Sequence, residues 1–293
     1  ATQALSLVMA IQGIAPVAAP ILGGLLVEPI GWRGILGVVA AFTGVLVLMV
    51  AFWVPESLPA AHRRDGGLRL LVDGTRELVR DRVLVRLLVI NALAFGLLMS
   101  YLSAAPFVLR NVLGMGTAAY TGVFGLCGAT VTVMVSVAAS LARRFPQVRQ
   151  VRAGLLAVLA VDVVFAAVCL IRLRGPVDGA GRAPLLVGVI ALFLVHVACL
   201  GPLMGNVPAL ALDRTGRWAG TGSALLGFIQ FVVGGLVSPL VGLTGEASGA
   251  AFGVVIVGLG VIANVLAAFG LRGEGQEERL PEEAERRRRR LGR

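Results

Sequence analysis

Eight long apolar stretches, most of them free of charge, constrain this chain more than any other feature. They run from Ala4 to Val27, Gly34 to Val54, Leu84 to Leu109, Ala118 to Ala142, Ala153 to Ile171, Leu185 to Leu212, Trp218 to Leu243 and Ala250 to Leu271. About 20 apolar residues carry a helix across the hydrocarbon core of a bilayer. Charged residues make up only 14% of the chain, against about 25% in an ordinary soluble domain. We therefore expect an all-α, polytopic membrane protein with eight transmembrane helices.

The basic side chains, all 26 of them arginine, predict how these helices are oriented. Counted over successive loops, 21 arginines fall on one side of the predicted membrane and 5 on the other. Loops rich in basic residues stay on the cytoplasmic side. The pattern predicts a multi-pass protein of a bacterial plasma membrane, with both ends of the chain in the cytoplasm. The basic excess then serves orientation and attraction to anionic lipid, and we expect no nucleic-acid partner.

The stretches are unevenly spaced along the chain. Two of them fall in residues 1–54, a charged connection occupies 55–83, six fall in 84–271, and a charged tail occupies 272–293. Within the connection, apolar side chains from Leu68 to Val79 recur on one helical face, which predicts a short helix along the cytoplasmic interface. A solvated charged linker is the alternative. Because the chain opens at Ala1, close to a full span, we expect it to be a piece of a longer protein.

The first apolar stretch carries an unusual glycine and proline pattern. Its members are Gly13, Pro16, Pro20, Gly23 and Gly24. Proline removes a backbone donor and disrupts a soluble helix, whereas membrane helices tolerate it because neighbouring helices satisfy the freed carbonyls. Glycines let a second helix approach closely. A kinked, tightly packed helix of this kind favours a transporter, with a generic small-residue packing face as the alternative.

Four motifs give the chain a family resemblance. They are Gly13 to Gly24 followed by Gly31-Trp32-Arg33 and Pro55-Glu56-Ser57-Leu58; Ser103 to Leu109; Asn206 to Leu212; and Gly220 to Gln230. In order and spacing they resemble the fifth to sixth, seventh, tenth and eleventh helices of the bicyclomycin-resistance (Bcr/CflA) branch of multidrug efflux proteins in the major facilitator superfamily. The resemblance covers nearly the whole chain short of the tail.

The resemblance implies a fold and a function. Members have twelve helices in two six-helix halves, so this chain resembles helices five to twelve. Residues 1–54 would be the last two helices of the N-terminal half, 55–83 the cytoplasmic linker between the halves, 84–271 the C-terminal half, and 272–293 a cytoplasmic tail. The family exports amphipathic drugs in exchange for protons, using the proton gradient and no bound cofactor. The acidic residue of the first helix, which takes part in proton coupling, has no counterpart here, so the missing N-terminal helices are expected partners.

The glycine and proline pattern of the first stretch also resembles the antiporter motif of drug:proton exchangers. That motif bends the fifth helix and seals the interface between the two halves. This sequence has Ala19 where the broader superfamily has glycine before Pro20. Because alanine is also small, the departure is mild.

Polar side chains inside the apolar stretches are the candidates for the substrate cavity, since polar atoms facing lipid are costly. Ser223, Gly227, Gln230 and Gly234 recur at helical spacing on one face, for which close helix packing is the alternative reading. In other stretches the candidates are Asn91, Tyr101, Ser103, His196 and Asn206. Tyr101 has an interfacial anchor as its alternative role. We expect Asn206 and Pro208 to mark a local break whose carbonyls face the pathway.

Asp162 and His196 are ionisable residues at mid-depth and therefore weak candidates for proton coupling. If adjacent, they could exchange a proton. The span of Asp162 corresponds to the family's ninth helix, which lies outside the cavity, so a hydrogen-bonded packing role is the preferred reading for Asp162. For His196 two readings are equally favoured: contact with substrate, and a hydrogen-bonded histidine in the core.

Three function classes follow from the sequence. The first is a fragment of a proton-coupled multidrug exporter, and the second is a non-transporting membrane remnant or helix scaffold. A membrane-embedded enzyme would need a nucleophile with its base or clustered ligands, which the two histidines and three scattered cysteines do not supply. We expect no enzyme, no metal site and packing roles for Cys127, Cys169 and Cys199.

Overall fold

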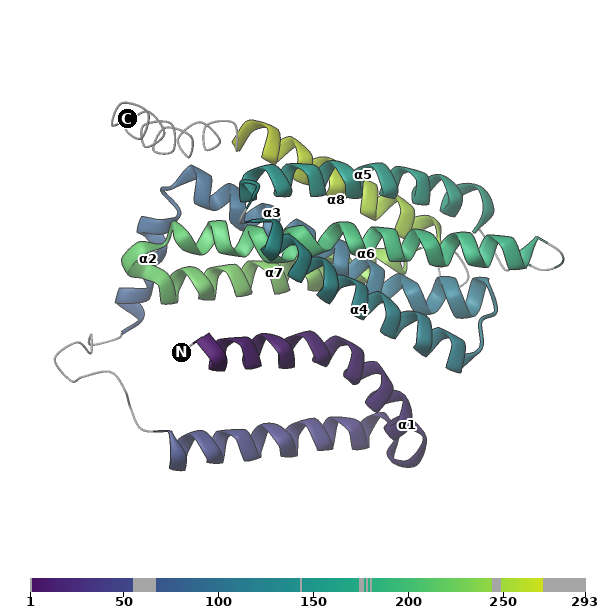
Figure 1. Ribbon diagram of the computed structural model, residues 1–293, viewed down its shortest axis with the longest axis horizontal. Coiled ribbons are helices and arrows are strands. Elements are labelled where there is room, and N and C mark those ends of the chain that lie inside the picture. The colour runs from purple at the N-terminus through teal and green to yellow at the C-terminus, as the bar shows by residue number, and fades with distance from the viewer. Residues whose placement is uncertain are drawn as a thin grey trace, which may run out of the picture. The chain divides into compact units, whose positions relative to one another are not determined.

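The described part of the chain is folded almost entirely into helices (Figure 1). The structure, a computed structural model, describes residues 2–54, 67–142, 144–173, 177, 179, 181–243 and 249–270, and it leaves out the side chains of 2–21, 24, 25, 28, 68 and 270. The helices are α1 (Thr2–Trp53), α2 (Leu68–Leu78), α3 (Arg82–Pro106), η2 (Phe107–Val112), α4 (Thr117–Leu141), α5 (Gln147–Arg172), α6 (Arg182–Asp213), η3 (Gly216–Trp218), α7 (Ala219–Val241) and α8 (Ala250–Gly270).

Among the described residues, seven helices are long and apolar enough to cross a membrane. They are Pro29–Trp53, Arg82–Val112, Thr117–Leu141, Gln147–Arg172, Arg182–Asp213, Gly216–Val241 and Ala250–Phe269. They match the second to eighth predicted spans. The largest difference is at α5, which begins at Gln147 and not at Ala153. The exposed Arg149 can keep its charge in water through its long stem although the backbone is already helical.

The element α1 consists of two helical arms joined at Gly31. A straight helix of 52 residues would be about 78 Å long, more than twice the thickness of a bilayer core. Gly31 has φ 64° and ψ 176°, a conformation that a side chain disfavours, and Figure 1 shows the chain reversing direction there. The arms correspond to the predicted spans Ala4–Val27 and Gly34–Val54.

The chain separates into two compact units, residues 1–73 and 74–293. The predicted division placed a linker at 55–83, and the boundary falls inside that range, within α2. The short helix expected from the amphipathic pattern is thus present as α2, whereas the start of the connection and the tail 272–293 lie outside the described residues.

The second unit is a helical bundle built around α3. Helix α3 packs against α6, α7 and α8, while α4 packs on α6 and α5 packs on both α6 and α8. The crossing of α6 over α4 is very close. A methyl group at Gly201 would lie only 2.8 Å from the carbonyl carbon of Met134 and 3.0 Å from the backbone nitrogen of Val135. Small residues at crossings of this kind let membrane helices gain dispersion contacts that no hydrophobic force supplies in lipid.

A cluster of aromatic rings fills the middle of the bundle. Phe165 of α5, Phe193 of α6 and Phe252 of α8 are fully buried, with ring centroids 4.8 to 5.7 Å apart. Tyr101 of α3 joins the cluster at 5.4 Å from Phe193 and stacks on Phe124 of α4 at 5.7 Å. Such offset and edge-to-face pairs contribute about 0.5–1.5 kcal/mol each beyond their burial. The rings therefore join five helices into one core.

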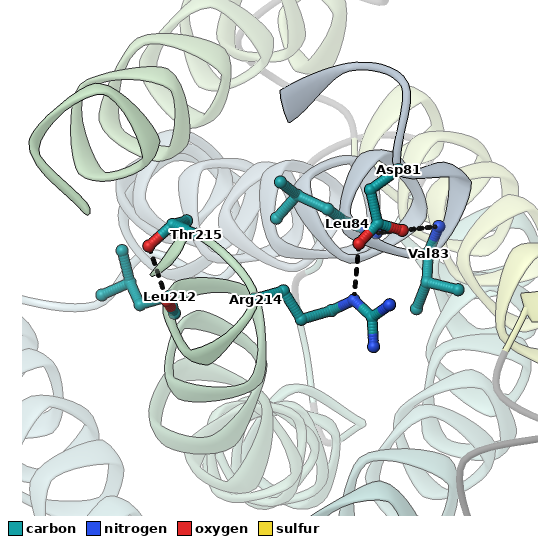
Figure 2. A network of polar contacts seen from close by, with 6 residues as sticks. All are labelled: Asp81, Val83, Leu84, Leu212, Arg214 and Thr215. Carbon is teal, nitrogen blue, oxygen red and sulfur yellow. Dashed lines mark hydrogen bonds and ion pairs between the residues drawn. The ribbon is translucent and has the colours of Figure 1, made fainter. Parts of the chain in front are cut away.

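Polar contacts fix one end of the bundle, where α3 begins (Figure 2). Asp81 caps α3 by accepting hydrogen bonds from the amides of Val83 at 2.9 Å and Leu84 at 3.2 Å, and its other oxygen pairs with Arg214 at 2.8 Å. Burial raises the pKa of Asp81, but the hydrogen bonds from Arg214 and the two amides outweigh it and hold the pKa below its ordinary value. This end of α3 is thereby held to the segment after α6.

A second ion pair joins α2 to the same region. Glu77 of α2 pairs with Arg217 of η3 at 2.7 Å, and the Arg217 guanidinium lowers the pKa of Glu77 below its ordinary value. Gly74 lies against the ring of Trp218, with a methyl position only 2.7 Å from it. The short helix α2 is thus attached to the residues between α6 and α7.

Candidate functional site

The most prominent polar contact between spans joins Asn91 of α3 to Gln230 of α7. The Asn91 amide nitrogen donates to the Gln230 side-chain oxygen at 3.0 Å. Asn91 is 2% exposed, and Gln230 is half-buried. Burying an amide without a partner is costly, so each side chain stabilises the other inside the apolar helices. The half-exposed amide of Gln230 keeps hydrogen-bonding capacity at the surface of the bundle.

The surroundings of this pair are apolar and aromatic. One turn further along α7, Gly234 is buried against Phe95 and Met99 of α3, and a methyl group there would lie 2.8 Å from Met99. Phe95 also meets Phe231 edge-to-face at 5.1 Å, and the Phe231 ring is 66% exposed. Hydrogen-bonding groups therefore stand beside exposed aromatic surface, a combination that suits an amphipathic ligand.

The four residues predicted to share one face of α7 divide between two roles. Gly234 packs closely against α3, and Gln230 accepts the hydrogen bond from Asn91 of α3. Ser223 is exposed near the start of α7 and donates to the Gly220 carbonyl at 2.9 Å. Gly227 has open space where a side chain would begin. Close packing, the alternative reading of this face, thus occurs at Gly234, while its place in the substrate cavity stays a prediction.

The remaining candidates on α3 lie closer to the aromatic cluster. Tyr101 is 4% exposed and belongs to that cluster, so its ring lies inside the bundle. Ser103 is half-buried. Beyond them Pro106, which lacks a backbone donor, precedes the π-helical turn η2, in which the Leu113 amide bonds to the Val108 carbonyl at 3.0 Å.

Asn206 of α6 faces α5. It is 3% exposed, and its amide nitrogen donates to the side-chain oxygen of Gln150 at 3.2 Å. The predicted local break at Asn206 and Pro208 is wrong, because α6 continues through Pro202 and Pro208 to Asp213. Neighbouring helices support a membrane helix at proline, so the missing donor does not interrupt it.

Asp162 and His196 are in direct contact. The His196 Nδ1 lies 2.5 Å from the Asp162 Oδ1, and both side chains are 0% exposed. Asp162 comes from α5 and His196 from α6, one turn away from Phe165 and Phe193 respectively. Asp162 is therefore hydrogen-bonded, as its preferred reading expects. It is also adjacent to His196, as exchange of a proton between the two would require.

An apolar groove with a volume of about 320 Å³ opens between α4, α5 and α6. Its lining includes Met134, Leu141, Gln150, Ala157, Cys199 and Pro202. Cys199 lies one turn from His196 on α6. One residue of the groove lining is therefore a helical turn away from the Asp162–His196 pair.

Residues 1–239 match the Major Facilitator Superfamily. The chain belongs to the major facilitator superfamily. Within this family it is 28% identical over 271 residues to the uncharacterized MFS-type transporter YdgK of Bacillus subtilis, covering 92% of this chain and 64% of the relative. It is 26% identical over 269 residues to the bicyclomycin resistance protein homolog of Haemophilus influenzae, covering 91% and 64%. The multidrug resistance protein MdtL of Vibrio parahaemolyticus is 28% identical over 139 residues, which is 47% of this chain and 34% of that protein.

In agreement with this family, the described part of the chain is all-α and holds seven helices long and apolar enough to cross a membrane, and the relatives are bacterial. The chain spans 64% of the length of the first two relatives. The antiporter-like pattern lies in the first arm of α1. The structure does not describe the side chains of four of its members, Gly13, Pro16, Pro20 and Gly24. Gly23 is helical. The role of this pattern stays a prediction.

Sequence reasoning missed two amides that join helices in this superfamily bundle. Asn264 of α8 donates to the Leu155 carbonyl of α5 at 2.8 Å, and Gln150 accepts from Asn206. Asn264 could have been found by the rule that located Gln230, because an amide inside an apolar helix needs a partner. Gln150 could not, because it lies between Arg149 and Arg152, outside the predicted span. The part of the chain that the structure describes holds no group of three or more His, Cys, Asp or Glu that could bind a metal ion.

Proposed function

We propose that this chain is part of a proton-coupled multidrug exporter of the bicyclomycin-resistance branch. It would supply the last two helices of the N-terminal half and all of the C-terminal half, and four further N-terminal helices would complete the transporter. Drug would leave in exchange for protons as one half rocks against the other around a site near the bilayer midplane. The proton gradient supplies the energy, and no cofactor is needed.

The contact between Asn91 and Gln230 carries the proposal that amphipathic drugs are the substrates. An exporter for such compounds needs apolar surface with a few hydrogen-bonding groups. Gln230 presents a half-exposed amide held in place by Asn91 at 3.0 Å, beside the exposed ring of Phe231. The names of two relatives, a bicyclomycin resistance homolog and a multidrug resistance protein, support the same substrate class.

The sidedness of the protein is part of the proposal. The side rich in arginine would be cytoplasmic, which places the Asp81–Arg214 and Glu77–Arg217 pairs at the cytoplasmic end of the bundle. Both ends of the chain would then be cytoplasmic, and α2 would lie along the inner membrane surface, where its arginines meet anionic lipid.

A drug-efflux assay tests the proposal. The complete reading frame that contains this chain is expressed in a bacterial strain lacking its own exporters, and loss of an amphipathic fluorescent dye is followed with and without a protonophore. We expect efflux that collapses with the pH gradient. Efflux at the level of an empty vector, with the protein present in the membrane, would instead favour a non-transporting remnant or helix scaffold.

Two variants test the site within the same assay. Gln230→Ala removes the half-exposed amide, and Pro20→Leu removes the proline of the antiporter-like pattern; each is expected to lower efflux at unchanged protein level. Asn264→Ala is the matched control, because it removes another interhelical amide that the proposal gives no substrate contact. If all three variants export like the wild type, the site assignment is wrong.

A further inference from the structure

The Asp162–His196 pair is the most deeply buried ionisable contact in the described part of the chain. Both side chains are 0% exposed, and Nδ1 lies 2.5 Å from Oδ1. They come from different helices, and the neighbouring turn carries the buried rings of Phe165 and Phe193. Packing alone does not require such a pair, because apolar residues of similar size are often as stable at buried positions.

Each partner keeps a polar atom without a hydrogen bond. These atoms are the Asp162 Oδ2 and the His196 Nε2, both buried. The Oδ2 lies on the α8 side, 3.6 Å from the position that a methyl group on Gly260 would take. Buried polar atoms are nearly always satisfied, so two of them in one contact mark a place where a proton, or the water that delivers it, can be accommodated.

Few titratable groups lie around the pair. Cys199 of α6 is close to Asp162, and Tyr101 of α3 reaches Phe193, one turn from His196. Helix α8 carries no titratable residue between Ala250 and Gly270. Among the described residues, Asp162 and His196 form an ion pair with each other and with no third residue. The net charge of the pair therefore depends only on the protons that these two side chains hold.

The cost of burying charge decides how many protons the pair holds. With a carboxylate and a neutral imidazole the pair has a net charge of −1, which a dry interior disfavours strongly. One added proton makes it neutral, either as carboxylate and imidazolium or as carboxyl and imidazole. With one hydrogen shared between Nδ1 and Oδ1, the added proton sits either on the His196 Nε2 or on the Asp162 Oδ2, the two atoms without a hydrogen bond. In the −1 form the Nδ1–H donates to Oδ1, and both of these atoms are bare.

We propose that Asp162 and His196 form a buried proton-binding site in which Nε2 is the atom that exchanges the proton. On release, the Nε2–H bond breaks, the proton passes to a water molecule, and the Nδ1–H···Oδ1 hydrogen bond remains. This inference rests on the proposed function, because it places a binding site for the coupling ion in the C-terminal half of the exporter. The site becomes chargeable only when water reaches it.

The structure indicates the side from which water arrives. The rings of Phe165, Phe193 and Phe252 pack against one another one turn from the pair. In the other direction along α6, Cys199 lies one turn from His196 and lines the groove between α4, α5 and α6. The groove is apolar apart from Gln150, so in this arrangement the pair stays dry and keeps its proton. Separation of α5 from α6 along the groove would hydrate the pair and release it.

Histidine NMR gives a direct test, because the chain contains only two histidines, His62 and His196. In the full 293-residue chain with His62→Gln, ring-labelled with ¹⁵N in detergent micelles, His196 reports alone. We expect a hydrogen on Nε2 at neutral pH that is lost in alkaline solution while Nδ1 keeps its own. A bare Nε2 at neutral pH, or a hydrogen that persists over the whole accessible range, would overturn the proposal.

A transport assay separates proton exchange from a structural role. Asp162→Asn keeps a hydrogen-bonding side chain of the same shape but cannot hold the charge. In the complete transporter we expect this variant to lose efflux driven by a pH gradient while it retains exchange of internal for external drug, which moves no net proton. Asn264→Ala, which loses an interhelical hydrogen bond without a titratable group, should keep the ratio of the two activities.

The two ways of failing are distinct. Equal loss of gradient-driven efflux and drug exchange in Asp162→Asn would show a structural role and overturn the proton site. A wild-type protein that exports nothing would instead refute the proposed function, and the NMR experiment would still decide whether the pair binds a proton.

Discussion

At the scale of single residues, this bundle is held by polar side chains that satisfy one another across helix interfaces. Asn91 bonds to Gln230, Asn206 bonds to Gln150, and Asp162 contacts His196. The first contact joins α3 to α7, and the other two both join α5 to α6. Such contacts are not necessarily stronger in lipid than in water, because measured interhelical hydrogen bonds in a membrane protein average about 0.6 kcal/mol. Their value lies in fixing which helix faces meet.

The Asn91–Gln230 hydrogen bond should give a measurable coupling energy. In a double-mutant cycle with Asn91→Ala and Gln230→Ala, we expect a coupling of about 0.6 kcal/mol and no more than about 1.7 kcal/mol. Unfolding of the purified chain in increasing denaturing detergent measures it. Pairing Asn91→Ala with Asn264→Ala is the control, and a coupling as large in that pair would show that the cycle does not report this contact.

Asp81 should contribute both a helix cap and an ion pair. Asp81→Ala is expected to cost about 1 kcal/mol, the usual value of an N-cap, whereas Asp81→Asn keeps the cap, loses the pair with Arg214, and should cost less than Asp81→Ala. Because the pKa of Asp81 in the folded protein is lowered, its charge stabilises the fold above the unfolded pKa of about 3.9 and loses that effect as the pH falls below it.

Unfolding measured at several pH values checks both statements. The stability difference between the wild type and Asp81→Asn should be present at pH 6 and should vanish as the solution becomes more acidic than about pH 3.9. A difference that grows on acidification would contradict the assignment.

At the scale of elements, the helices were readily predictable and their contacts were not. Six bundle helices agree with the predicted spans because apolar length alone decides whether a segment crosses a bilayer. The contact between Asp162 and His196, 34 residues apart, depends on how α5 turns towards α6, which no local pattern encodes. The continuity of α6 through Pro208 was missed for the same reason, since its support comes from other helices.

The close crossing of α4 and α6 should tolerate no side chain at Gly201. A valine there would meet the backbone of Met134 and Val135, and overpacking of this kind costs about 1–3 kcal/mol. Gly188→Val on the same helix is the matched control, because Gly188 has open space around its methyl position. Thermal unfolding of both variants checks this, and equal stability of the two would show that the crossing can yield.

At the scale of the whole molecule, family membership follows from the match over residues 1–239, while coupling, substrate and sidedness remain proposals. The candidate cavity could be located from the sequence only as far as Gln230 and Asn91, because their amide side chains stand out within apolar stretches. Which amides pair with each other, and which face open space, depends on the packed bundle.

Sidedness can be tested by labelling single cysteines from outside the cell. In a chain whose three native cysteines are replaced by alanine, Arg110→Cys should react with a membrane-impermeant maleimide in intact cells. Arg149→Cys should react only after permeabilisation, because it lies on the arginine-rich side. Both parent residues are exposed in the structure, so access to the reagent differs only through the membrane. The opposite labelling pattern would invert the proposed orientation.

The ring cluster has a mechanical consequence for the bundle. It takes one aromatic side chain from each of α3, α4, α5, α6 and α8, so a tilt of any of these helices disturbs rings on the others. Helix α7 gives no ring to this cluster; its Phe231 meets only Phe95 among the described aromatic pairs. Helix α7 is held instead mainly by α3, through the close packing at Gly234 and the hydrogen bond between Asn91 and Gln230. A displacement of α7 by a bound molecule would therefore be transmitted to the rings chiefly through α3, which carries Tyr101.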